Sequence, residues 1–296
     1  MDFSMQHSGF FNVDEAHTEL VEETRIPKVS VVVPTLNEEK NLPHVLPRIP
    51  EWVHEVILVD GRSKDRTRAV ARELIPDIRI VMERRKGKGA ALQAGFAAAT
   101  GDIIVMIDAD GSMAPEEMHS YVGALVAGAD FVKGSRFLQG GGTSDMEFYR
   151  RAGNWGLMML VRMGFGGQYS DLCYGYNAFW KHVLPVLDLD ADGFEIETLM
   201  NIRILKADLN IAEVPSFEEE RIHGVSNLRT IPDGCRVLRT IVTEWFKGKS
   251  RKAAAVSQPE WVANGAIPSP FMHRAFGFSG NLVRQHLVAG NEFKRN

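Results

Sequence analysis

The first half of the chain repeats one pattern of hydrophobic and polar positions. Short runs of apolar residues, typical of strands buried on both faces, alternate with amphipathic segments of helical length. The runs cover residues 28–34, 55–60, 77–82 and 102–108. Strands that alternate with helices in this way form parallel pairs joined by right-handed crossovers. The pattern therefore predicts an α/β fold with a mostly parallel sheet flanked by helices.

A helix is expected after each of these strands. Asn37 is expected to be the N-cap of the first helix, because acidic residues follow it in the first turn. Gly87-Lys88-Gly89 leads into an alanine-rich helix over residues 90–99. Helix N-termini attract phosphate and Lys88 adds positive charge, so this segment favours a position beside the phosphates of a substrate. A simple helix entry is the alternative.

The most informative polar residues follow the fourth strand. Asp108 and Asp110 come directly after five consecutive apolar residues, 103–107. Ligands bind at the carboxyl edge of such sheets, and two carboxylates on one turn suit Mg²⁺ or Mn²⁺ that carries a phosphate-bearing substrate. A polar turn that merely ends the strand is the alternative, and the surrounding motifs must decide between the two.

The second half of the chain mixes strands with longer amphipathic helices. Strands are predicted over residues 129–133, 174–180 and 210–215, and a helix is predicted to start at residues 194–200. The glycine-rich segment 138–145 predicts a flexible loop that is long enough to form a lid.

Two helices, predicted over residues 148–165 and 236–246, each place apolar side chains on one face. The first also carries Arg150, Arg151 and Arg162. A helix with an apolar face and cationic side chains suits a lipid surface, although packing in the core is the commoner use of such a face.

Composition narrows the class of protein. Of the 296 residues, 45% are hydrophobic and 24% are charged, as in a globular protein, and the net charge of −4 argues against a general nucleic-acid binder. Charge is uneven, because residues 1–26 hold six acids against one arginine, whereas residues 247–296 hold eight Lys or Arg against two Glu. The acidic arm is expected to be disordered. Cys173 and Cys235 lack metal-type spacing, so reduced thiols in a cytoplasmic protein are expected.

No stretch has the features of a signal peptide, and no run of 18 apolar residues occurs. The sequence therefore predicts no membrane-spanning helix, and the two amphipathic helices with the basic tail predict peripheral attachment to an anionic membrane surface. The oligomeric state does not follow from the sequence.

The chain contains six short polar motifs, which are Val33-Pro-Thr-Leu-Asn-Glu38, Val59-Asp-Gly-Arg-Ser-Lys-Asp65, Gly87-Lys-Gly89, Asp108-Ala-Asp110, Gly134-Ser-Arg136 and Arg221-Ile-His-Gly-Val-Ser226. They occur in the order seen in the family-2 glycosyltransferases, and the sequence resembles that family over roughly residues 28–232, in particular its dolichol-phosphate mannose synthase branch. The resemblance implies a GT-A, Rossmann-like fold and metal-dependent transfer of a hexose, with inversion, from a GDP- or UDP-sugar to a polyprenyl or dolichyl phosphate at the cytoplasmic membrane face.

The resemblance also suggests an organisation of the chain. An acidic arm (1–27) precedes the transferase domain (28–232), which divides into a nucleotide-sugar half (28–135) and an acceptor half (136–232). An amphipathic helix and basic tail follow (233–296).

Roles for single residues follow partly from the resemblance and partly from the chemistry that the reaction requires. The expected catalytic residues are Asp110, Arg136 and Glu197, and the expected metal ligands, for Mg²⁺ or Mn²⁺, are Asp108, Asp110 and Ser112. Expected acceptor contacts are Arg136, Arg150 and Arg151. Expected donor contacts are Pro34, Leu36, Glu38, Val59, Asp60, Lys88, Asp108, Ala109, Asp110, Arg221 and Asn227.

Three departures from the family pattern bear on donor preference. A second acid after Asp60 is replaced by Gly61, a glutamine two residues after the aspartate pair is Ser112, and a lysine after the Gly-x-Ser is Asn227. They leave the base and the sugar open.

The chemistry agrees with these residues. Cleavage of a sugar–diphosphate bond leaves negative charge on the departing diphosphate, which a metal and Arg221 can neutralise. A phosphate acceptor is already anionic, so a strong general base is unnecessary. Glu195 and Glu197 remain open between a base or sugar-hydroxyl ligand and a solvated helix start.

Three other functions compete with this interpretation. They are a glycosyltransferase with a soluble or polysaccharide acceptor in cell-envelope glycan synthesis, a sugar-phosphate nucleotidyltransferase, and a non-catalytic sugar-nucleotide-binding protein. A nucleotidyltransferase usually has a glycine-rich signature directly after its first strand, where this chain has Pro34-Thr-Leu-Asn-Glu38.

Overall fold

The computed structural model describes residues 26–144, 146–167 and 169–248. The acidic arm, which we expected to be disordered, and the basic tail lie outside the described residues, and the domain boundaries at residues 27 and 232 stay predictions.

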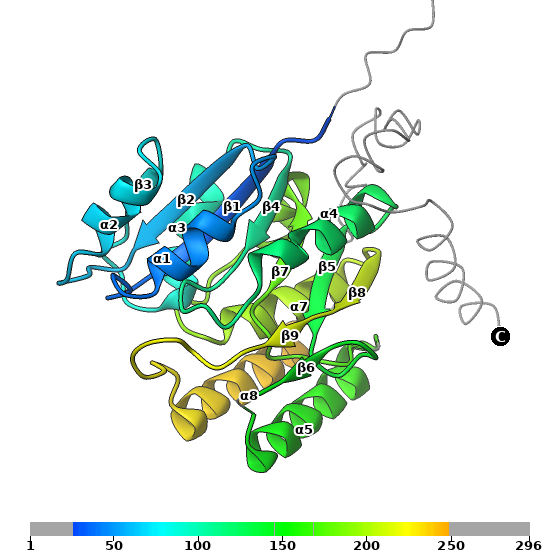
Figure 1. Ribbon diagram of the computed structural model, residues 1–296. Helices are drawn as coiled ribbons and strands as arrows, with labels where there is room; N and C mark the ends of the chain where they lie inside the picture. Colours follow the sequence, from blue (N-terminus) through cyan, green and yellow to red (C-terminus); the bar gives the residue numbers. More distant parts are fainter. Residues whose placement is uncertain (1–25, 145, 168, 249–296) are drawn as a thin grey trace, which may run out of the picture.

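A seven-stranded sheet forms the centre of the molecule (Figure 1). Its strand order is β3-β2-β1-β4-β7-β5-β8, and β7 alone among the seven runs antiparallel to its neighbours β4 and β5. The mostly parallel α/β sheet predicted from the sequence is therefore confirmed. The strands are β1 (Val29–Thr35), β2 (Glu55–Asp60), β3 (Arg79–Met82), β4 (Ile103–Met106), β5 (Phe131–Ser135), β7 (Asn177–Trp180) and β8 (Ile211–Pro215).

Helices cover both faces of this sheet. The helices of the described residues are α1 (Leu42–Val45), α2 (Thr67–Leu74), α3 (Lys88–Ala98), α4 (Met118–Val126), α5 (Phe148–Phe165), α6 (Leu184–Leu187), α7 (Ile196–Lys206) and α8 (Thr230–Phe246), with short 3₁₀ turns η1 (Leu46–Arg48), η2 (Pro115–Glu117) and η3 (Lys181–Val183), and α5 and α8 lie in a further layer described below. Because helices lie on both sides, the central strands are buried on both faces, which explains their unbroken apolar runs.

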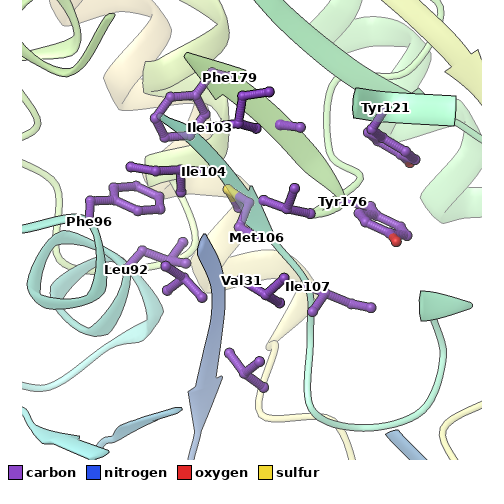
Figure 2. Close-up of a cluster of buried hydrophobic side chains, with 14 of the residues drawn as sticks. Val31, Leu92, Phe96, Ile103, Ile104, Met106, Ile107, Tyr121, Tyr176 and Phe179 are labelled. Atoms are coloured by element: carbon purple, nitrogen blue, oxygen red, sulfur yellow. The ribbon is translucent and has the colours of Figure 1, made fainter. Parts of the chain in front are cut away.

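The main core lies between the sheet and its helices. All four residues of β4 are buried, and Ile104 packs near Phe96 of α3, while Tyr176 and Tyr121 stack on the other side of the strand (Figure 2). This packing fixes where β4 ends, and so fixes the position of the aspartates that follow it.

A second layer is built from α5, α7 and α8, around a smaller apolar cluster that includes Val161, Ile202 and Ile241. Figure 1 shows α5 and α8 side by side, away from β1, β2 and β3. Among the described residues, no helix is both long enough and apolar enough to cross a membrane.

Two local predictions are wrong. Asn37 is not an N-cap, because α1 begins only at Leu42; Asn37 has φ of 59°, and its side-chain oxygen accepts the N–H of Lys64. Segment 138–144 is not a free loop, because it contains β6 (Gly142–Thr143), which pairs with β9 (Phe217–Glu218) in a separate two-stranded sheet.

A buried carboxylate fixes the position of α8. Glu244 is 3% exposed and pairs with Arg203 (3.3 Å), Lys206 (2.9 Å) and Lys247 (3.0 Å), of which the first two belong to α7. Burial alone would raise the pKa of Glu244, but hydrogen bonds from Lys206 and Lys247 and the charge of Arg203 outweigh it and lower the pKa. The ionised glutamate therefore ties α8 to α7.

Replacing Glu244 by Gln should lower the free energy of unfolding by about 1–3 kcal/mol, because hydrogen bonds to a charged group are lost. Denaturant titration measures this difference. The control is Glu73→Gln, which removes an exposed pair with Arg66 and should cost at most about 0.5 kcal/mol. Because the folded pKa of Glu244 lies below its ordinary 4.5, its stabilisation is complete above about pH 4.5 and disappears as the pH falls through the folded value. Equal stability of wild type and variant at neutral pH would contradict the assignment.

Candidate active site

A cleft of about 410 Å³ lies at the carboxyl edge of the parallel strands. It is lined from the end of β1, the start of α3, the segment after β4, α5 and the start of α8. This volume is within the range of small-molecule sites. The two halves of the chain meet here, as expected for a donor and an acceptor that must come into contact.

Lys88 occupies the centre of a carboxylate cluster. Its Nζ lies 2.6 Å from Asp108 Oδ1, 2.8 Å from Asp108 Oδ2 and 2.7 Å from Glu197 Oε1. Burial would lower the pKa of Lys88, but the two carboxylates raise it, so this lysine is a cation. Burial, together with the charges of Asp110 and Glu197, raises the pKa of Asp108 in spite of Lys88.

The glycines of the Gly87-Lys88-Gly89 motif place this lysine. A Cβ on Gly89 would stand 2.2 Å from the Ala191 carbonyl oxygen, and one on Gly87, whose φ is 115°, would stand 2.0 Å from the Asp192 carbonyl oxygen. Only glycine allows the chain before α7 to approach so closely. The approach brings Glu197, in the first turn of α7, to Lys88.

Arg221 holds the other aspartate. Its Nη2 lies 3.2 Å from Asp110 Oδ2, and its Nη1 lies 3.0 Å from Glu38 Oε1. Burial raises the pKa of Glu38 although Asn41 and Arg221 donate hydrogen bonds to it. The hydroxyl and the N–H of Ser112 donate to Asp110 Oδ1 over 2.7 and 3.0 Å. The segment around Arg221 is thereby tied to the turn after β4.

The cluster carries an excess of negative charge. Glu38, Asp108, Asp110 and Glu197 contribute four negative charges when ionised, and Lys88 and Arg221 contribute two positive charges, which leaves two. Across the described ranges, no group of three or more His, Cys, Asp or Glu could hold a metal ion. Two aspartates and the Ser112 hydroxyl fit a magnesium-type ion, which takes one or two carboxylates and completes its shell with water and substrate phosphates.

Most of the predicted site residues line the cleft. They are Pro34, Leu36, Glu38, Lys88, Asp108, Ala109, Asp110, Ser112, Arg136, Arg150, Glu197, Arg221 and Asn227. Glu197 is buried and ion-paired, so the solvated helix start considered for it is wrong. Glu195 lies at the N-cap of α7, outside the lining.

Three predicted contact residues lie outside the lining of the cleft. Val59 is fully buried in β2. Asp60 is also fully buried. Its carboxylate accepts the N–H of Ser63 over 3.0 Å and lies 3.5 Å from Arg68, so it stabilises the turn after β2. The Arg151 guanidinium stands over the Phe137 ring, 5.4 Å from its centroid. A direct contact with a ligand is therefore not supported for these three.

Arg136 reaches the cleft but already has partners. Its Nε and Nη2 donate to the two oxygens of Asp171 over 2.6 and 2.9 Å, and its Nη1 donates to Glu218 over 2.9 Å. Burial would raise the pKa of Asp171, but Arg136 and Lys133 lower it overall. Nothing in the sequence around Asp171 indicated this pairing, whereas Glu218 belongs to a polar segment whose composition is unusual for a plain linker.

Other residues that line the cleft were not predicted. They include Arg62, Met146, Tyr149, Asn154, Cys173, Leu228 and Thr230. On α5, Tyr149 comes just before Arg150 and Arg151, and Asn154 comes after them. Because Asn154 follows Arg150 by four residues, the two lie on the same face of the helix, which was the one signal in the sequence for Asn154.

The fold and the paired aspartates define the class of protein, a GT-A type of nucleotide-sugar enzyme. Glucosyl-3-phosphoglycerate synthase from Mycobacterium tuberculosis, solved with phosphoglyceric acid, superposes with a TM-score of 0.60 and 25% identity, over 74% of this chain and 80% of that one. The same enzyme solved with Mn²⁺, UDP-glucose and phosphoglyceric acid gives 0.58 and 25%, over the same 74% and 80%.

The sequence comparisons identify the family. The family model for glycosyl transferase family 2 matches residues 30–184. A polyprenol monophosphomannose synthase of Mycolicibacterium smegmatis is 34% identical over 76% of this chain and 90% of its own length. An undecaprenyl-phosphate mannosyltransferase of Micrococcus luteus is 32% identical over 68% and 87%. The chain belongs to glycosyltransferase family 2.

A dolichol-phosphate mannosyltransferase of Pyrococcus furiosus is also similar, with 34% identity over 68% of this chain. The chain spans 59% of the length of that relative.

Arg221→Gln should loosen the segment around residue 221, because the two ion pairs to Glu38 and Asp110 are lost. Amide hydrogen exchange over residues 219–228 should become roughly 5- to 30-fold faster, as expected when a charge-assisted hydrogen bond of about 1–2 kcal/mol is removed. The control is Arg236→Gln, an exposed arginine paired with Asp233, which should leave exchange over 219–228 unchanged. Unchanged exchange in the Arg221 variant would show that the ion pairs do not hold the segment.

Proposed function

We propose that this protein transfers a hexose, with inversion, from a nucleotide-diphosphosugar to a polyprenyl phosphate. The observation that carries the proposal is that one cleft is lined both by Asp108 and Asp110, which suit a metal–diphosphate, and by arginines that suit a second phosphate, Arg136 and Arg150. The names of the three relatives, all polyprenyl- or dolichyl-phosphate mannosyltransferases or synthases, support a lipid phosphate as acceptor.

The donor would lie against the carboxyl ends of β1 and β4. Pro34 and Leu36 supply apolar surface for the nucleoside, and Ala109 lies between the two aspartates. Asp108, Asp110 and the Ser112 hydroxyl would hold Mg²⁺ or Mn²⁺, which supplies a Lewis acid and a template for the diphosphate. The two excess negative charges of the cluster match such an ion. Arg221 would exchange a carboxylate partner for a phosphate oxygen, for which its planar guanidinium is well shaped.

The reaction requires positive charge beside the departing diphosphate and access for the acceptor phosphate to the opposite side of the sugar. Negative charge grows on the diphosphate as the bond to the sugar breaks, and Lys88 and Arg221 stand where positive charge stabilises it. The acceptor phosphate attacks from the opposite side, which inverts the configuration at the anomeric carbon. Because Glu197 is ion-paired with Lys88, we assign it to positioning this lysine and not to removing a proton.

The exposed faces of α5 and α8 would bring the cleft to the lipid, with the protein on the cytoplasmic side. Phe148 and Trp155 are 85% and 60% exposed on α5, and Ile231 and Phe246 are 78% and 89% exposed on α8. The two helices pack against each other, and both line the cleft through other residues. A lipid phosphate that leaves the bilayer beside these aromatic residues would enter next to Arg150.

The structural neighbours favour a second candidate, transfer to a soluble phosphorylated acceptor, because glucosyl-3-phosphoglycerate synthase was solved with phosphoglyceric acid. Both candidates share an anionic phosphate as nucleophile. They differ in whether the product partitions into organic solvent.

Incubation with a panel of radiolabelled GDP- and UDP-hexoses, Mg²⁺ or Mn²⁺, and either polyprenyl phosphate or phosphoglycerate should give a labelled product that partitions into organic solvent with polyprenyl phosphate. Asp110→Asn should lower this transfer by a factor on the order of 100 to 1000, since charge stabilisation of the leaving group is lost. Mn²⁺ binding, followed by electron paramagnetic resonance with nucleoside diphosphate present, should weaken in the same variant. If radioactivity appears only in a water-soluble product made from phosphoglycerate, the soluble acceptor is the correct one and the lipid acceptor is excluded.

Replacing Phe148 and Trp155 together by Ser should weaken binding to anionic phospholipid vesicles, by a factor on the order of 10 for each aromatic side chain removed from the interface. Vesicle flotation at several salt concentrations measures it, and binding of the wild type should weaken as salt rises. Met82→Ser removes a side chain that is 51% exposed on β3, at the opposite edge of the sheet, and should leave binding unchanged. Equal binding of all three proteins would exclude the face of α5 as the attachment surface.

A further inference from the structure

The two carboxylate partners of Arg136, Asp171 and Glu218, differ in burial and in the number of hydrogen bonds that they accept, and the predicted role of Arg136 does not explain this difference. Asp171 is fully buried, takes two hydrogen bonds from the guanidinium, and also accepts the N–H groups of Arg136 (3.3 Å) and Cys173 (3.2 Å). Glu218 takes one guanidinium hydrogen bond, and its side chain is 20% exposed. Asp171 is therefore a fixed partner, whereas Glu218 can leave Arg136 without unfolding its surroundings.

Glu218 also stands beside the aspartate turn. Its backbone forms an antiparallel bridge with Met113, and the next residue, Glu219, donates its N–H to the Ser112 carbonyl oxygen over 2.8 Å. Ser112 in turn donates its hydroxyl to Asp110. Glu218, Arg136 and Arg150 all line the cleft. The pair of Arg136 Nη1 with Glu218 thus belongs to the lining of the cleft in which an acceptor phosphate must approach the donor.

Electrostatic repulsion prevents the Glu218 carboxylate and an acceptor phosphate from binding Nη1 of Arg136 at the same time. One guanidinium with two carboxylates already carries an excess negative charge, so a phosphate added beside Glu218 would be repelled. A phosphate that takes the place of Glu218 keeps the Nη1 hydrogen bond and removes the repulsion. Thr143, whose hydroxyl donates to the same Glu218 oxygen over 2.9 Å, would lose that bond, which is one neutral hydrogen bond at a partly exposed site.

We propose that Glu218 is an internal competitor of the acceptor phosphate. Its carboxylate pairs with Nη1 of Arg136 and turns away when the phosphate group of the acceptor binds there. Glu218 is then a specificity-determining residue, because only a ligand with enough negative charge displaces it, and the corresponding alcohol does not. This inference rests on the proposed function, since it assigns a role within the same acceptor site.

The test measures binding of a short, water-soluble prenyl phosphate by calorimetry, in the presence of Mg²⁺ and nucleoside diphosphate. Glu218→Gln keeps the size of the side chain and an oxygen for Thr143 but removes the competing charge. It should bind the prenyl phosphate roughly 10-fold more tightly than the wild type. In steady-state assays it should lower KM for the acceptor more than it changes kcat, which a purely structural role would not do.

Three controls separate charge at this position from other effects. Glu220→Gln makes the same change two residues away, on an exposed side chain, and should bind the prenyl phosphate like the wild type. Glu218→Asp keeps the charge on a side chain shorter by one methylene group, so it should tighten binding less than Glu218→Gln does. Asp171→Asn should weaken binding, because Arg136 loses its fixed partner. Unchanged or weaker binding in Glu218→Gln, or equal tightening in Glu218→Gln and Glu220→Gln, would overturn the proposal.

Failure of the proposed function has a different signature. A wild type that binds the prenyl phosphate and transfers sugar to it, with no tightening in Glu218→Gln, would exclude only the role of Glu218. A wild type that binds neither the prenyl phosphate nor a polyprenyl phosphate, and transfers no sugar to either, would exclude the lipid-phosphate acceptor itself and the competitor role with it.

Discussion

The pairing of each aspartate of the turn after β4 with a cation of the protein is the interaction on which the candidate site depends. Asp108 faces Lys88, and Asp110 faces Arg221. Each cation has a second carboxylate, Glu197 or Glu38, that belongs to another element. Five segments far apart in the sequence are therefore held around one partly buried group of charges, and such charges are stable there because each has a partner.

This arrangement also stabilises the cleft before any substrate arrives. Two carboxylates close together would repel each other at the end of β4, and burial would increase that repulsion. Lys88 and Arg221 relieve this repulsion and still leave the cluster with two excess negative charges when its carboxylates are ionised. A charged ligand that takes the place of one aspartate would leave each cation a second carboxylate, Glu197 or Glu38, so the proposed binding requires only movements of side chains.

The sequence predicted the sheet and the aspartate turn well because both depend on local features. Runs such as 103–107 are apolar without interruption, and polar residues that follow a buried strand lie at the sheet edge by geometry alone. The predictions at Asn37 and at segment 138–145 failed because contacts with distant residues, Lys64 and β9, override local preference there.

The partners of charged side chains were the hardest to predict. Asp171 lies 35 residues from Arg136, and Glu218 lies 82 residues away, so no spacing in the sequence could indicate that they share one guanidinium. The burial of Asp60 was likewise not predictable, because it depends on the folding of residues 61–63 and on the approach of Arg68. A motif can thus indicate which residue types come together at a site. Whether a charged side chain there already has an ion-pair partner can be learned only from the structure.

The direction of β7 has a consequence for how this architecture can change. Since β5 and β7 are antiparallel neighbours, with Lys133 opposite Asn177, the chain leaves the sheet after β5 and returns to it before β7 at the same edge. The segment between β5 and β7, which contains α5 and Asp171, therefore begins and ends at neighbouring positions of the sheet, close to the aspartate turn. A change of length in this segment leaves the order of the seven strands unaltered, although its contacts with β9 and α8 must be kept. Under the function proposed above, changes in this segment would alter the acceptor side of the cleft and leave the strands that carry the donor side in their order.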